Sequence, residues 1–72
     1  MEVSIITINY NSSVYTLKLL SSILKKVSDK IKYEIIIIDN ASEKNDYKNL
    51  IDKSPKDSRI KIVRSDINTG FS

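Results

Sequence analysis

The chain has 72 residues, of which 40% are hydrophobic and 29% are charged, and its formal net charge is +3. This composition is typical of one small globular domain or part of one, and the mild, scattered excess of lysine argues against nucleic-acid or membrane-surface binding. Because cysteine and histidine are absent, disulfides, thiolate or imidazole metal sites and Ser-His-Asp or Cys-His catalysis are excluded within the chain.

No apolar run reaches the roughly 20 residues that a membrane-spanning helix needs. The first residues also lack the basic segment of a signal peptide. A cytoplasmic location is therefore expected, with membrane association left open for a longer parent protein.

The first predicted element is a strand over residues 3–9, which is rich in β-branched residues and leads into Asn9, Tyr10 and Asn11. Residues 11–13 are of the types that cap helix N-termini, and apolar residues follow at intervals of three and four. This spacing predicts an amphipathic helix that packs on the sheet and turns its lysines to water. The apolar stripe consists of Val14, Leu17, Leu20, Leu24 and Val27, widened by Leu19 and Ile23.

The central feature of the sequence is the stretch over residues 35–42, where four consecutive isoleucines run into Asp39, Asn40, Ala41 and Ser42. An uninterrupted apolar run is typical of a central parallel strand that is covered on both faces. In open α/β sheets, ligands bind beyond the carboxyl ends of the strands. Asp39 and Asn40 are therefore candidate binding residues.

A short helix is predicted over residues 43–53, a turn over 54–58 and a third strand over 59–65. The last seven residues contain the only glycine and read as the start of a further element. The predicted fold is α/β, a three-layer βαβαβ parallel-sheet fragment with strand order third, second, first. Because the sheet has an open edge, we expect the 72 residues to be part of a larger domain and to self-associate through that edge.

The polar residues at the strand ends suggest a nucleoside pocket. Tyr10 offers a flat ring for stacking, and Asp39 offers an acceptor for an imide N–H or for sugar hydroxyls. The alternatives are structural: Tyr10 could simply cover the end of the sheet, and Asp39 could form an Asx-turn or helix cap. Asn40 and Ser42 are turn and cap types, and a tight turn would account for Asn68 and Gly70.

Two motifs are excluded or weak. The turn after the first strand has no glycine, so a glycine-rich phosphate loop and a classical dinucleotide site are not expected. The Asp66-x-Asn68 pair has one carboxylate and one amide, which makes a poor site for a hard cation.

Three segments in this order resemble the amino-terminal third of a family 2 glycosyltransferase, most closely its rhamnosyltransferase-like branch. They are residues 3–11, residues 37–42 and residues 68–72. The resemblance implies the Rossmann-like GT-A fold, a nucleotide-diphosphate sugar donor, a glycan or lipid-linked acceptor, and inverting displacement at the anomeric carbon. It also implies a role of the parent in cell-surface polysaccharide biosynthesis.

The resemblance further implies the roles of individual residues. Tyr10 matches the ring that lies against the donor base, Ile8 and Asn9 border that base, and Asp39 matches the acid that reads the base N–H. Asn40 occupies a position where many members have a second aspartate. Asn68 and Gly70 match the Asn-x-Gly turn beside the ribose and phosphates.

The resemblance also indicates what these residues lack. The Asp-x-Asp element that holds Mg²⁺ or Mn²⁺ and the catalytic base would lie beyond residue 72, so no catalytic or metal-binding residue is assigned here. The 72 residues are expected to need no metal and to be inactive alone.

Two alternative functions remain open from the residues themselves. One is a receiver-like domain in which Asp39 accepts a phosphoryl group, although the first strand lacks the acid pair that would hold magnesium. The other is a non-catalytic interaction module that uses the open sheet edge.

Overall fold

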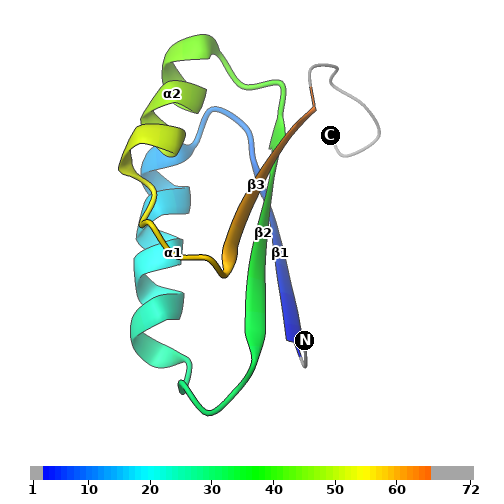
Figure 1. Cartoon of the computed structure of the whole chain (residues 1–72). Helices are drawn as coiled ribbons and strands as arrows, with labels where there is room; N and C mark the ends of the chain where they lie inside the picture. The colour runs from blue at the N-terminus through cyan, green and yellow to red at the C-terminus, as the bar shows by residue number, and fades with distance from the viewer. Residues whose placement is uncertain (1–2, 66–72) are drawn as a thin grey trace.

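The computed structural model describes residues 3–65, in which strands and helices alternate (Figure 1). The five elements are β1 (Val3–Asn9), α1 (Ser13–Lys26), β2 (Tyr33–Asn40), α2 (Lys44–Lys53) and β3 (Ile60–Ser65). This order confirms the predicted βαβαβ arrangement, and the element boundaries lie close to those expected from the sequence. The predicted turn of Asn68 and Gly70 lies outside the described residues.

The three strands form one sheet in the order β1-β2-β3, and both neighbouring pairs are parallel. The register places Asn9 beside Asp39, and Asp39 beside Arg64. Side chains that are level in neighbouring strands share a sheet face. Polar residues of three strands therefore meet at one edge of the sheet. The sequence predicted this for the ends of β1 and β2, whereas its candidates after the third strand, Asn68 and Gly70, lie outside the described residues.

Both helices lie on the same face of this sheet (Figure 1). The described residues thus form two layers, and the expectation of three layers was wrong for this part of the chain. The reason is topological. Each strand–helix–strand crossover between parallel strands is right-handed. When successive strands are added in one direction across the sheet, this handedness puts every crossover helix on the same face of the sheet.

The core lies between the helices and the covered face of the sheet. It is formed by Leu20, Tyr33, Ile35, Ile37 and Leu50. On the other face, Ile6 and Val63 expose 62% and 54% of their surface, while Ile36 and Ile38 are half-buried. The prediction that the isoleucine strand is covered on both faces was therefore wrong for residues 3–65.

Helix α1 also differs from the predicted stripe at its first turns. Its inward positions there are Ser13 and Thr16, whereas Val14 and Leu19 are exposed. The reason is that the beginning of α1 packs against the polar side chain of Asn9, to which Thr16 donates a hydrogen bond of 2.7 Å. The first fully buried apolar side chain of α1 is that of Leu20, further along the helix.

The amino ends of the strands carry a separate cluster. The Arg59 guanidinium lies 4.7 Å from the ring centroid of Tyr33 and 2.7 Å from Asp57 Oδ2. Hydrogen bonds from Arg59 lower the pKa of Asp57 to about 2. This cluster ties the turn after α2 to the start of β2, at the opposite end from the predicted site.

Candidate functional site

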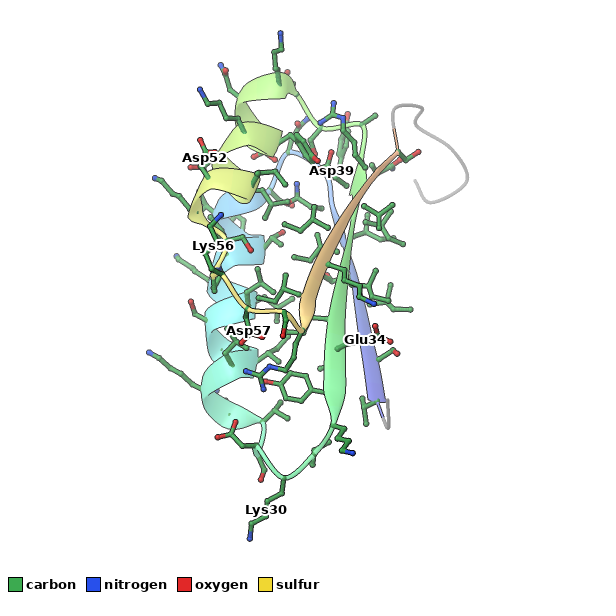
Figure 2. The ribbon with its side chains drawn as sticks, viewed as in Figure 1. Lys30, Glu34, Asp39, Asp52, Lys56 and Asp57 are labelled. Atoms are coloured by element: carbon green, nitrogen blue, oxygen red, sulfur yellow. The ribbon has the colours of Figure 1, made fainter. Side chains whose placement is uncertain are left out.

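The predicted site residues of the described part gather at the carboxyl edge of the sheet. Ile8 and Asn9 end β1, Tyr10 follows them, and Asp39 and Asn40 end β2. Figure 2 shows Asp39 at the end of β2 that lies nearest to the start of α2. Asn68 and Gly70 lie outside the described residues, so their predicted roles stay predictions.

The edge has two sides because side chains alternate along a strand. Asn9 and Asp39 point to the face that the helices cover, and both are fully buried. Ile8 belongs to the open face and is 42% exposed, and Tyr10 is 52% exposed. Alternation also turns Asn40 away from Asp39, although Asn40 is buried.

Asn9 donates hydrogen bonds at the centre of the covered side. Its Nδ2 group lies 2.8 Å from Asp39 Oδ1 and 3.1 Å from Asp46 Oδ2. A third acceptor, Ser42 Oγ, lies at 3.2 Å. One amide group thus connects β1 to the end of β2 and to α2.

The carbonyl oxygen of the same side chain is also occupied. Asn9 Oδ1 accepts hydrogen bonds from Thr16 Oγ1 at 2.7 Å and from Ser12 Oγ at 3.3 Å. Both donors belong to the start of α1. Since a buried polar group costs free energy unless it is paired, this complete pairing is what allows an amide to occupy the interior.

Asp39 is engaged on both carboxylate oxygens. Oδ1 accepts from Asn9, while Oδ2 accepts from the Ser42 N–H at 3.2 Å and from Arg64 Nη1 at 3.4 Å. The bond to Ser42 is the turn role that the sequence left as an alternative. Asp39 is fully buried, which argues against its acting as an exposed phosphoacceptor. Its predicted role in reading a base stays a prediction.

Asp46 was missed by the sequence reasoning. It belongs to α2, yet its Oδ1 accepts a hydrogen bond of 3.0 Å from the N–H of Ser13, the first residue of α1. The Ser12 side chain makes no capping bond of its own, so Asp46 caps α1 across the structure. Burial raises the pKa of Asp46, but hydrogen bonds from Ser13 and Asn9 outweigh it and lower the pKa below its usual value.

The loops after β1 and β2 bind each other. The Asn11 N–H donates to Ser42 Oγ at 2.9 Å, and the Glu43 N–H donates to Asn11 Oδ1 at 2.7 Å. Glu43 is the N-cap residue of α2, so Asn11 caps the second helix just as Asp46 caps the first. The sequence showed suitable cap types but not that each helix is capped by a residue distant in the sequence.

Each of these loops contains a non-glycine residue in the left-handed region, Asn11 at φ 50° and Ala41 at φ 53°. Asparagine tolerates this conformation, but alanine pays about 1 kcal/mol or more for it. Such backbone strain persists where surrounding contacts hold it, and it is concentrated at functional sites. Here the hydrogen bond from the Ala41 N–H to the Ser65 carbonyl, at 2.8 Å, helps to hold the turn.

Arg64, at the end of β3, is a second residue that the sequence reasoning missed. Its Nη2 group donates to the Ser42 carbonyl at 3.0 Å, and its guanidinium lies 4.3 Å from the ring centroid of Tyr47. Together with its contact to Asp39, this links β3 to the loop before α2. The register beside Asp39 is the signal that could have indicated it.

The described residues provide no metal site of their own. Within residues 3–65, no group of three or more acidic, histidine or cysteine side chains is placed to hold an ion. The carboxylates of Asp39 and Asp46 instead accept hydrogen bonds from Asn9. In the described residues, these carboxylates therefore hold the loops at the sheet edge in place.

A parallel α/β unit with a polar, loop-built site at the carboxyl edge of its sheet belongs to the broad class of Rossmann-like nucleotide-binding folds. The particular family follows from comparison with known families, in which the model described as glycosyl transferase family 2 matches residues 4–72. The chain therefore belongs to glycosyl transferase family 2, as its motifs had indicated. No curated protein and no solved structure matched it.

Proposed function

We propose that these residues form the nucleotide-recognition part of a glycosyltransferase that takes a sugar from a nucleotide-diphosphate donor. The observation that carries the proposal is the family match over residues 4–72. The geometry supports it, because the polar ends of β1 and β2 meet at one sheet edge beside the exposed ring of Tyr10. Glycan or lipid-linked acceptors and inversion at the anomeric carbon belong to the same proposal, as does the rhamnosyltransferase-like branch.

In this proposal Tyr10 stacks on the base, and Ile8 provides an apolar border on the open side of the edge. Asn40 borders the base where β2 ends. Asp39 is too deeply buried for a ligand to reach unless residues 41–43 move, so its reading of a base N–H requires that movement. With its present contacts, Asp39 fixes the loop against which the nucleotide would lie.

A divalent metal would neutralise the leaving diphosphate. Residues 3–65 contain no group of side chains placed to hold such an ion. We propose, from the family resemblance, that its ligands lie beyond residue 72. We also propose that the chain alone does not transfer sugar, because the family resemblance puts the group that removes the acceptor proton beyond residue 72.

The proposal is tested by titrating UDP and dTDP into the isotopically labelled chain and following amide chemical shifts. We expect shifts at residues 8–11 and 39–43, and a loss of affinity of about tenfold for Tyr10→Ala, since stacking of one base on an aromatic ring contributes about 1–3 kcal/mol. Tyr15→Ala is the matched control, because it removes another exposed tyrosine ring, to which the proposal assigns no contact with the nucleotide.

The role of Asp39 is tested in the same titration with Asp39→Asn, which keeps the shape of the side chain and removes its charge. Weaker binding with an unchanged circular dichroism spectrum would support a direct role. If Tyr10→Ala and Asp39→Asn both bind as the parent chain does, the site assignment is wrong.

A further inference from the structure

The fold gathers lysines on the outer side of α1. This helix carries Lys18, Lys25 and Lys26 and contains no aspartate or glutamate. Within residues 3–65 none of these three ammonium groups forms an ion pair. Their positive charge is therefore not compensated locally and is directed to the surroundings.

The shape of the surface between these lysines is a second observation. A shallow hollow of about 430 Å³ is lined by α1 residues alone. Its lining consists of Leu17, Lys18, Ser21, Ser22, Lys25 and Lys26. Three lysines and two serines line this hollow beside the half-buried Leu17, and their ammonium and hydroxyl groups are donors suited to phosphate oxygens.

Exposed apolar side chains continue this surface toward the beginning of α1. Val14, Tyr15 and Leu19 expose 57%, 74% and 41% of their surface. Tyr15 lies 5.9 Å from the Lys18 ammonium, so one ring and one cation are presented together. Aromatic and aliphatic side chains beside lysines are the combination that binds the boundary between lipid headgroups and acyl chains.

The second helix differs although it lies in the same layer. In α2 the lysines alternate with Asp46 and Asp52, and Figure 2 shows Asp52 on the outer side of the helix. Lys30 projects from the end of the molecule opposite Asp39 (Figure 2), but it follows the exposed Asp29 and is not counted with the α1 lysines. Of the two helices, α1 is therefore the one whose lysines have no acidic residue on the same helix.

The lysines are scattered along the sequence, but the fold brings three of them to one surface of α1. We propose that this outer surface docks on an anionic lipid bilayer. Lysine ammonium groups attract phosphate headgroups, and each one near an anionic membrane surface adds to binding in a salt-dependent way. A straight helix can lie flat on a bilayer, with Tyr15 at the level of the headgroups. The proposal does not depend on nucleotide binding, because α1 presents this surface away from the sheet.

The test is sedimentation of the chain with vesicles of equal parts phosphatidylglycerol and phosphatidylcholine, compared with phosphatidylcholine alone. We expect binding only to the anionic vesicles, decreasing as salt is added. The double variant K25E/K26E should bind the anionic vesicles at least about tenfold more weakly than the parent chain. The matched control K44E/K48E makes the same change of charge with two exposed lysines of α2, and should bind within about threefold of the parent chain.

Equal losses in the two double variants would show that net charge alone drives binding, and would overturn the proposal. Preference for a single-stranded RNA over anionic vesicles would also overturn it. Circular dichroism spectra of both variants check that α1 remains folded.

A reporter gives an independent test, because the chain contains no tryptophan. With anionic vesicles, the emission of Tyr15→Trp should shift to the blue, whereas that of Val63→Trp, on the open sheet face, should not. A shift for Val63→Trp without one for Tyr15→Trp would mean that the sheet face docks instead, and would refute the proposal.

Discussion

Asn9 shows how a single polar side chain can organise this molecule. It is fully buried, and its amide contacts residues from β2, α1 and α2. An amide suits this position because it donates to the carboxylates of Asp39 and Asp46 while it accepts from the hydroxyl of Thr16. A carboxylate of the same shape would place three acids together, and an apolar residue would remove one hydrogen-bond donor from each of Asp39 and Asp46.

Replacing Asn9 by alanine is therefore expected to lower the free energy of unfolding by about 2–3 kcal/mol, since it strands buried polar groups. Urea denaturation followed by circular dichroism measures this loss. Asn45→Ala, at an exposed position of α2, should change stability by less than about 0.5 kcal/mol. Comparable stability of the Asn9 and Asn45 variants would contradict the proposed role of Asn9 as the centre of the network.

At the scale of elements, each helix begins on a cap provided by another part of the chain. Asp46 of α2 accepts from the first residue of α1, and Asn11 of the loop after β1 accepts from the N-cap residue of α2. Because these caps are reciprocal, neither helix can shift without disturbing the loop that the other needs. The two loops that border the proposed nucleotide site are held by this arrangement.

The capping by Asp46 predicts a pH dependence of stability. Its pKa in the folded chain lies below the ordinary value of 3.8 that it takes when unfolded. The stabilisation is thus fully present above that value, and it is lost as the pH falls through the lower, folded pKa. We expect Asp46→Asn to cost about 1 kcal/mol at neutral pH and to flatten the decline in stability below about pH 4.

Thermal unfolding between neutral and acidic pH checks this expectation. Asp57 titrates in the same range, because Arg59 lowers its pKa to about 2, so the comparison is made in an Asp57→Asn background. The exposed Asp52→Asn serves as the control on the same helix. An Asp46→Asn chain with an undiminished acid dependence would rule out this cap as its source.

At the scale of the whole molecule, the described residues cover the sheet on one face only. The other face carries Ile6, Ile8 and Val63 as exposed apolar residues, and both β1 and β3 are edge strands among the described residues. Exposed β-branched side chains beside unpaired strand edges favour association with another chain. The self-association expected from the sequence stays a prediction, to which the open face now gives a location.

We expect Ile6→Lys to shift the 72-residue chain toward the monomer in light scattering, because a charge on an edge strand opposes both face and edge contacts. Val14→Lys adds the same charge at an exposed position of α1 and should leave the association state unchanged. A parent chain that is monomeric at every concentration would contradict the prediction, as would equal effects of the two substitutions.

The sequence by itself determined the elements, their order and the family. Strand and helix periodicities, the isoleucine run and the polar residues at the strand ends were enough, because these signals are local along the chain. Residues Asn9, Tyr10, Asp39 and Asn40 could be placed at one edge for the same reason, since parallel strands end together.

Only the tertiary structure decided how these residues are used. That Asp39 is fully buried and hydrogen-bonded, that Asp46 and Arg64 complete its surroundings, and that both helices cover a single face all depend on contacts between residues distant in the sequence. Residue types and spacing cannot report such contacts. Burial and hydrogen-bond partners are set by which elements pack together, and packing is a property of the folded chain.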